Sequence, residues 1–122
     1  MTQVLIVDDN DVSRMTLADL LDSMGYSVVS AGDGFEGVEL FRRTPSIVVL
    51  ITDVEMPGMN GVEMLQQLCK EIFERSVRVF MLSSSEFDDW WPQARACGAV
   101  GWLRKPVDPV SLEAALRVLG EQ

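Results

Sequence analysis

The sequence predicts a doubly wound α/β fold: a five-stranded parallel sheet with helices on both faces. Short runs of Val, Ile and Leu recur without alternating with polar residues, as is typical of strands buried on both faces. Stretches with helical spacing of apolar residues lie between these runs. A strict alternation of strands and helices favours right-handed crossovers, which make neighbouring strands parallel.

Each expected strand is a short apolar run, and each expected helix occupies most of the sequence between two strands. The strands are expected at Val4–Val7, Tyr26–Ser30, Ile47–Thr52, Val77–Leu82 and Val100–Leu103. The helices are expected near 12–24, 35–43, 61–73, 89–97 and 109–119.

Several helix ends carry recognisable signals. The first helix should stop before Gly25, because glycine readily adopts the left-handed conformation that follows a helix. Asp108 can cap the last helix, and Pro109 fits its first turn, where a missing N–H has no cost. In the fourth helix, Asp89 could serve as the cap and Pro92 would fall in the first turn, which sets the start near 89–90.

Length and composition indicate one globular domain over residues 1–122. The chain has 122 residues and is 48% hydrophobic, which suits a single buried core. Its net charge of −9 argues against direct binding of DNA, RNA or anionic membranes. We therefore expect protein partners rather than nucleic acid or lipid. We also expect a monomer or weak dimer.

Other residue types narrow the chemistry and the compartment. The absence of histidine excludes His-based catalysis, His-ligated metals and a phosphohistidine on this chain. Cys69 and Cys97 form no ligand motif, so buried reduced thiols and a cytoplasmic location are expected. The start of the chain has no signal-peptide pattern, and its apolar runs are too short to span a bilayer.

Polar residues that could perform chemistry follow four of the expected strands. Asp8 and Asp9 follow the first strand, Asp53 the third, Ser83 the fourth, and Lys105 the fifth. Each has an ordinary explanation as a helix cap, a turn residue or a solvated lysine. Their joint occurrence is much less common by chance, because a doubly wound fold binds ligands at the carboxyl ends of its strands.

This set of side chains suits a divalent cation and phosphoryl transfer. Three neighbouring carboxylates repel one another, so a cation is needed between them. Oxygen ligands without His or thiolate favour a hard ion such as Mg²⁺. A carboxylate can attack phosphorus while the metal, a lysine and a hydroxyl stabilise the phosphoryl oxygens.

With these strand-end residues, the chain resembles the receiver domain of two-component response regulators. The resemblance covers essentially the whole chain, with motifs in the expected order and spacing. They are Val4–Asn10, Asp53–Gly61, Met81–Ser84, Gly98–Ala99 and Lys105–Pro106. It implies a flavodoxin-like fold with strand order 2-1-3-4-5 and a signalling switch that belongs to a two-component system or phosphorelay.

The resemblance also implies a role for each acidic residue. Asp53 would accept a phosphoryl group from the phosphohistidine of a histidine kinase or histidine phosphotransfer protein. Asp9, Asp53 and the backbone carbonyl of Glu55 would ligate Mg²⁺, and Asp8 would complete the acidic pocket. Such a chain promotes its own phosphorylation and dephosphorylation but is not an enzyme acting on an outside substrate.

The remaining implied roles concern signal transmission. Ser83 would be the switch hydroxyl, Lys105 would pair with the phosphoryl group, and the Lys105–Pro106 bond would be cis. Trp102 stands where the family usually has a smaller switch aromatic, Tyr or Phe. A downstream protein would dock on the face formed by helix 4, strand 5 and helix 5.

Two features of the sequence leave alternatives open. Trp90 and Trp91 could be ordinary packing residues or an exposed aromatic anchor for a partner. The G-x-G-x-x-G pattern at Gly32–Gly37 resembles a dinucleotide fingerprint. It follows an edge strand and carries two acidic residues, so we interpret it as a loop and helix start.

Two other functions are possible for the same fold. The chain could be a docking module that signals without phosphorylation. It could also be a phosphatase-like hydrolase, with Asp53 as nucleophile and Glu55 as acid–base. The complete acidic set argues against the first alternative, and the short chain, without a visible substrate cap, argues against the second.

Overall fold

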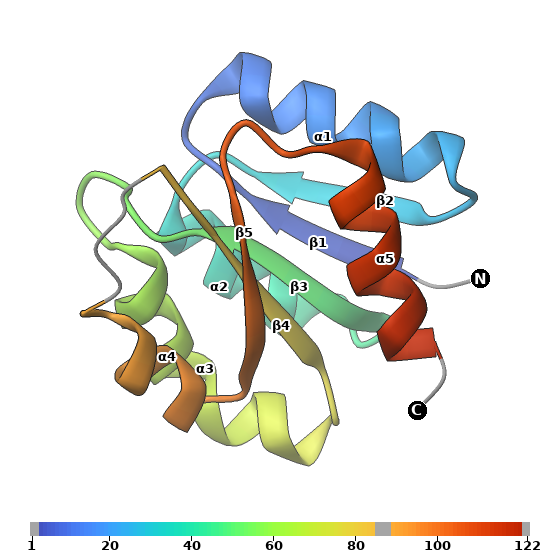
Figure 1. Ribbon diagram of the computed structural model, residues 1–122. Helices are drawn as coiled ribbons and strands as arrows, with labels where there is room; N and C mark the ends of the chain where they lie inside the picture. Colours follow the sequence, from blue (N-terminus) through green and yellow to red (C-terminus); the bar gives the residue numbers. More distant parts are fainter. Residues whose placement is uncertain (1–2, 85–88, 121–122) are drawn as a thin grey trace.

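The structure is a computed structural model that describes residues 3–84 and 89–120 (Figure 1). Strands and helices alternate along the whole described chain. The elements are β1 (Gln3–Val7), α1 (Asp11–Ser23), β2 (Ser27–Ala31), α2 (Gly34–Arg43), β3 (Ile47–Asp53), α3 (Gly61–Glu74), β4 (Arg78–Ser83), α4 (Trp91–Ala96), β5 (Ala99–Arg104) and α5 (Pro109–Gly120). Each expected strand and helix is found, with ends that shift by at most two residues.

All five strands are parallel and lie in the order β2-β1-β3-β4-β5. Helices α1 and α5 cover one face of the sheet, and α2, α3 and α4 cover the other (Figure 1). The predicted doubly wound topology is confirmed. The strand order reverses between β1 and β3, so a ligand site is expected beyond the carboxyl ends of these two strands.

The strands lack polar alternation because both of their faces are buried. In β1, Leu5 and Val7 belong to the core beneath α2, α3 and α4. Val4 and Ile6 belong to the second core, beneath α1 and α5. All four side chains are fully buried, so burial of apolar surface on both faces holds β1 at the centre of the sheet.

The helix ends confirm most of the local predictions and correct one. Gly25 follows α1 with φ +93°, and the Asp108 carboxylate accepts the Ser111 N–H at 3.2 Å. Asp89 does not cap α4: this helix begins at Trp91, and its cap residue Trp90 makes no side-chain capping bond. The prediction placed the start too early because it took Asp89 as the cap. The other half of that prediction is correct, since a proline occupies the first turn.

The Gly32–Gly37 segment is a loop followed by the start of α2, as predicted. The Asp33 side chain accepts the Glu36 N–H at 2.8 Å and caps the helix. The Glu36 side chain in turn accepts the Gly32 N–H at 3.2 Å. These carboxylates therefore satisfy the backbone N–H groups that a dinucleotide phosphate would otherwise bind.

The three tryptophans gather where α4 meets β5. Trp90 and Trp91 are half-buried and pack against the core beneath α2, α3 and α4. The Trp91 and Trp102 ring centroids lie 4.9 Å apart, and those of Trp90 and Trp102 lie 6.2 Å apart. Trp102 keeps 47% of its surface exposed. Packing therefore accounts for Trp90 and Trp91, while a role as partner anchor stays a prediction.

The two cysteines are free thiols, in agreement with the sequence. Cys97 is buried and Cys69 is half-buried. Burial and the neighbouring Cys69 thiol raise the pKa of Cys97 to about 11, so this thiol is protonated at neutral pH. Within the part of the chain that the structure describes, we find no helix long and apolar enough to cross a membrane.

One glycine sets the distance between α3 and the end of β3. A Cβ atom at Gly61 would lie 2.1 Å from the backbone carbonyl oxygen of Asp53. The Gly61 N–H donates to the Val54 carbonyl at 2.9 Å, so the two segments are also held together by a hydrogen bond. A side chain at this position would push α3 away from the loop that carries Asp53.

We predict that Gly61→Ala destabilises the protein by about 2 kcal/mol, because the new methyl group overlaps backbone that cannot yield. Urea unfolding followed by circular dichroism measures the change. The control is Gly32→Ala, whose Cβ would meet only the end of the flexible Arg14 side chain, at 3.4 Å or more. A Gly61→Ala protein as stable as the Gly32→Ala protein would contradict the prediction.

Candidate phosphoryl-transfer site

The parallel sheet brings the predicted site residues to one end of the molecule. Asp53 is the last residue of β3 and Ser83 the last of β4. Asp8 directly follows β1, and Lys105 directly follows β5. Residues that lie far apart in the sequence become neighbours because parallel strands end at the same edge of a sheet.

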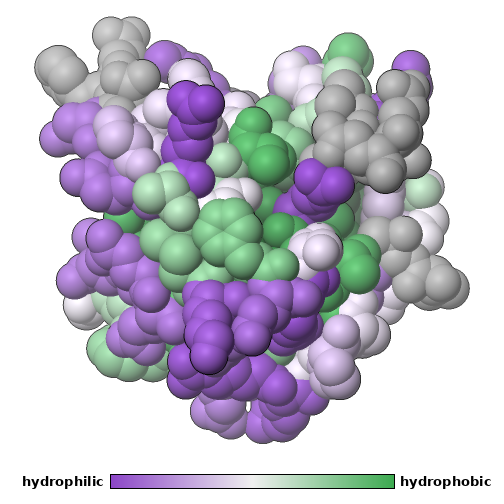
Figure 2. Space-filling view, turned by 90° about the horizontal axis from the view of Figure 1, so that it is seen from below, coloured by the Kyte–Doolittle hydropathy of each residue, from purple (hydrophilic) through white to green (hydrophobic). Residues whose placement is uncertain are grey.

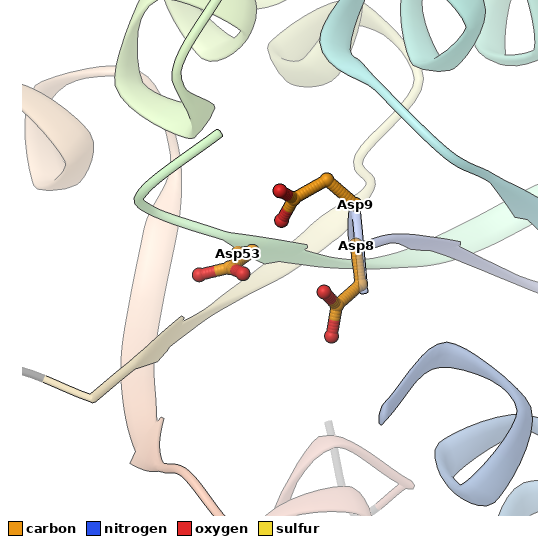
Figure 3. A group of neighbouring side chains, drawn as sticks. All are labelled: Asp8, Asp9 and Asp53. Atoms are coloured by element: carbon orange, nitrogen blue, oxygen red, sulfur yellow. The ribbon is translucent and has the colours of Figure 1, made fainter. Parts of the chain in front are cut away.

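Three carboxylates converge at this edge. Asp8, Asp9 and Asp53 each offer an oxygen atom, and these oxygens lie within 4.8 Å of one another. Figure 3 shows the three side chains gathered beyond the ends of β1 and β3. Asp8 is fully buried and Asp53 is 6% exposed, whereas Asp9 is exposed. The cluster therefore has a buried base and an open, solvent-facing side.

Lys105 lies between two of these carboxylates. Its Nζ atom is 3.0 Å from Asp8 Oδ2 and 3.0 Å from Asp53 Oδ2. The Lys105 N–H donates to the Ser83 carbonyl at 2.9 Å, which fixes the backbone of this lysine beside the end of β4. The following bond, Lys105–Pro106, is cis, as the family resemblance implied.

The buried charges shift one another's pKa values in different directions. Burial works to raise the pKa of Asp8, but hydrogen bonds from Ser13, the Asn10 N–H and Lys105 outweigh it, so the pKa is lowered. Burial and the Asp8 charge raise the pKa of Asp53, although Lys105 opposes them. Burial would lower the pKa of Lys105, but its bonds to both carboxylates leave it raised.

The start of α1 holds Asp8 in place, and sequence reasoning missed two residues that do so. Asp8 Oδ2 accepts the Ser13 hydroxyl at 2.6 Å, and Oδ1 accepts the Asn10 N–H at 3.0 Å. Arg14 Nη1 donates to the Asp8 carbonyl at 2.7 Å. The sequence did contain a signal for these two residues, namely the polar first turn of α1. Side chains in this turn lie next to the end of β1, which directly precedes the helix.

The ordinary explanation of Asp8 or Asp9 as the cap of α1 is wrong. Asn10 is the cap, and its side chain accepts the Ser13 N–H at 2.9 Å. The Asp8 and Asp9 carboxylates are therefore not used to cap α1. Asp8 instead interacts with Lys105.

Backbone and side-chain bonds also fix the end of β3. The Val54 N–H donates to the Leu82 carbonyl at 2.9 Å, and the Thr52 hydroxyl contacts the Asp53 carbonyl at 3.1 Å. The Glu55 N–H donates to Asp53 Oδ1 at 3.3 Å. Glu55 itself is exposed. These contacts hold the Asp53 carboxylate toward Lys105, with its other oxygen near the loop that follows.

The two predicted switch residues lie on neighbouring strands. Ser83 is 3% exposed and ends β4, beside Asp53 at the end of β3. Trp102 pairs with Met81 in the β4–β5 register, two residues before the pairing of Ser83 with Arg104. The residues are therefore placed for the roles that the resemblance implies, and those roles remain predictions.

The donor set fits a hard divalent cation. Asp8, Asp9 and Asp53 supply only carboxylate oxygen, which Mg²⁺ prefers over the nitrogen or sulfur ligands of softer metals. Because Asp9 is exposed, such a cation would keep contact with solvent and with an incoming phosphate. An open groove of about 610 Å³ lies beside Lys105, between α1 and the β5–α5 loop.

Comparison with known proteins identifies the family. A model of the response regulator receiver domain matches residues 4–117. The chain belongs to this family. Receiver domains are signalling domains and generally not enzymes.

The chain is 35% identical over 114 residues to the protein PilH of Pseudomonas aeruginosa, with 92% of each chain covered. It is 31% identical over 106 residues to the two-component response regulator ORR5 of Oryza sativa, covering 87% of this receiver domain and 79% of that protein.

Solved structures agree with this assignment. The chemotaxis protein CheY4 of Vibrio cholerae is 32% identical, with a TM-score of 0.87 over 96% of this receiver domain and 97% of that chain. A receiver domain from Clostridium thermocellum is 30% identical, with a TM-score of 0.86 over 96% of this chain and 92% of that chain. The fold is therefore the CheY-like form of the flavodoxin-like architecture.

We predict that Asp53→Asn raises the stability of the metal-free receiver domain. The raised pKa of Asp53 means that folding disfavours its ionised form, a penalty that is present above the folded pKa and disappears as the pH falls below the ordinary value of 3.8. Removing the charge should add about 1 kcal/mol at pH 7, or roughly 3–5 °C in Tm for a domain of this size.

Thermal unfolding in EDTA at pH 7 and pH 3.5 tests this expectation, with Asp19→Asn, an exposed acid on α1, as the matched control. The gain over the parent should shrink at pH 3.5. A lower Tm for Asp53→Asn at pH 7 would show instead that the pairing with Lys105 outweighs burial and the repulsion from Asp8.

Proposed function

We propose that this receiver domain is a phosphorylation-dependent switch of a two-component system or phosphorelay. Asp53 accepts a phosphoryl group from the phosphohistidine of a histidine kinase or histidine phosphotransfer protein. One observation carries the proposal: the Asp53 carboxylate lies with Asp8, Asp9 and Lys105 at the open end of the sheet. That arrangement supplies a nucleophile, a cation site and a fixed positive charge within a few ångströms.

In the transfer step, a carboxylate oxygen of Asp53 attacks phosphorus and forms the new P–O bond. The P–N bond to the donor imidazole breaks, and its electron pair returns to the ring nitrogen. Lys105 balances negative charge on the phosphoryl oxygens, and the Ser83 hydroxyl donates to one of them. Mg²⁺, held by Asp9, Asp53 and the Glu55 carbonyl with Asp8 beside them, would neutralise phosphate charge when bound.

Transmission to a partner follows from the same contacts. The new phosphoryl group competes with Asp8 for Lys105 and draws Ser83 toward it, which changes the ends of β4 and β5. Trp102 lies on β5 and contacts both tryptophans at the start of α4. We propose that the face formed by α4, β5 and α5 changes accordingly and controls a downstream protein, with the domain acting as a monomer or weak dimer.

Two alternatives lead to different experimental results. A docking module that works unphosphorylated would gain no phosphoryl group from small phosphodonors. A hydrolase with Asp53 as nucleophile and Glu55 as acid–base would turn over simple phosphate esters such as p-nitrophenyl phosphate. The interactions of Asp53 with Lys105 and with the Glu55 N–H support the switch, which accepts one phosphoryl group and promotes its own dephosphorylation.

We further propose that residues 1–122 form one receiver domain located in the cytoplasm. The free thiols of Cys69 and Cys97 are compatible with a reducing compartment. The net charge of −9 supports protein partners over nucleic acid and anionic membranes.

Incubation with acetyl phosphate and Mg²⁺ should add one phosphoryl group to the protein, because acetyl phosphate can replace the phosphohistidine donor. Intact mass spectrometry measures the adduct, and borohydride reduction locates it. Asp53→Asn should abolish the adduct, whereas Asp19→Asn should keep it. An adduct that survives in Asp53→Asn would overturn the assignment of the acceptor. The absence of an adduct at early quench times would favour the docking module.

Mg²⁺ should stabilise the folded protein, because the carboxylates converge only after folding. At a hundredfold excess over Kd the gain should be about 2.7 kcal/mol. Asp9→Asn should remove most of this gain and Asp19→Asn should not, as measured by thermal unfolding over a Mg²⁺ titration. An equal loss in both variants would point to general charge screening instead of a site.

A further inference from the structure

An open cavity lies at the opposite end of the sheet from Asp53. Its volume is about 430 Å³, within the range of specific binding pockets. It lies where α3 and α4 end and where β4 and β5 begin, and its walls include Ile72, Phe73, Ala99 and Val100. Since β4 has six residues, the cavity is roughly 17 Å from the phosphoryl-transfer site.

The walls of this cavity combine exposed apolar surface with two arginines. Phe73 is 58% exposed and Val100 is 49% exposed. Figure 2 views the molecule from this end and shows apolar surface in the middle of the face, bordered by hydrophilic groups. Arg78 and Arg95 also line the cavity, and Arg78 is half-buried.

The two arginines differ from most basic residues in the described part of the chain. Among the residues that the structure describes, the other basic side chains are held by carboxylates, backbone carbonyls or further contacts, with Lys70 as the one exception. For Arg78 and Arg95, no side-chain hydrogen bond or ion pair is found within residues 3–84 and 89–120. On a protein with a net charge of −9, such unneutralised guanidinium groups beside an apolar cavity are unexpected.

The ends of the neighbouring helices do not account for these arginines. Arginine often pairs with the free carbonyls at a helix C-terminus. At the end of α3, the Ile72 and Phe73 carbonyls accept the N–H groups of Val77 and Ser76. At the end of α4, the Arg95 carbonyl accepts the Gly98 N–H at 3.1 Å. The last turns are therefore closed by backbone, and the guanidinium groups are available to an outside anion.

We infer that this cavity, named here the basal pocket, docks a segment of a partner protein in which an apolar side chain is flanked by acidic residues. The apolar side chain would fill the space between Phe73 and Val100. Carboxylates on either side would pair with Arg78 and Arg95 through charge-assisted hydrogen bonds. The inference goes beyond the proposed switch, because it concerns a surface that takes no part in phosphoryl transfer.

The test uses the full chain labelled with ¹⁵N and an acetylated, amidated tetrapeptide of glutamate, leucine, phenylalanine and glutamate. We expect saturable changes in the amide signals of Phe73, Gly98 and Val100, with a Kd on the order of 1 mM. A twin peptide with glutamine in place of both glutamates should bind at least about threefold more weakly, because the paired charges are lost. Added NaCl should weaken only the acidic peptide.

Variants of the pocket complete the test. Arg78→Gln and Arg95→Gln should each weaken the acidic peptide about threefold, through loss of one charged pair. The control Arg117→Gln removes the same charge from an exposed position on α5, against the opposite face of the sheet. It should leave binding unchanged. Because Arg95 is exposed, its variant keeps the test valid even if Arg78→Gln impairs folding.

Three results would overturn the inference: no signal change at the pocket with millimolar peptide, equal binding of the glutamine twin, or an equal loss in Arg117→Gln. None depends on Asp53, so a failure here is distinguishable from a failure of phosphorylation.

Discussion

The lysine ammonium group between Asp8 and Asp53 is the contact on which the rest of the site depends. Without a cation, two buried carboxylates so close together would repel each other and oppose folding. Lys105 offsets this repulsion with two contacts of 3.0 Å. The compensation is incomplete: the pKa of Asp8 is lowered while that of Asp53 stays raised. Asp53, the proposed acceptor, is therefore the less well stabilised of the two carboxylates.

The difference in stabilisation between Asp8 and Asp53 explains how the site could be held firmly in the fold and still respond to a ligand. Asp8 is held by Ser13, by a backbone N–H and by Lys105, so it forms a fixed base for the acidic pocket. Asp53 depends on Lys105 and on the N–H of Glu55. A ligand that brings positive charge, or a phosphoryl group that changes the partner of Lys105, would act chiefly on Asp53. The surrounding backbone stays in place because it is bonded to neighbouring strands.

The basal pocket would give the molecule a second functional end. The proposed phosphoryl-transfer site concentrates negative charge at the carboxyl ends of the strands, and the basal pocket places two arginines near the starts of β4 and β5. The rigid sheet separates the two ends, and β4 and β5 run from one to the other. An acidic segment bound at one end would therefore not compete with a phosphodonor at the other.

The sequence by itself determined the order of elements, the parallel sheet and which polar residues meet beyond the strand ends, because apolar runs and strand-end motifs are local patterns. It misjudged one cap, since Asp89 does not cap α4, and it did not identify Asn10 as the cap of α1. Only the tertiary structure decided that Lys105 contacts Asp8 as well as Asp53, and that Ser13 supports Asp8. Such contacts depend on differences of a few tenths of an ångström in the distances between separate elements, which periodicity and spacing do not encode. The basal pocket could not be predicted from a sequence motif, because its walls come from two helices and two strands.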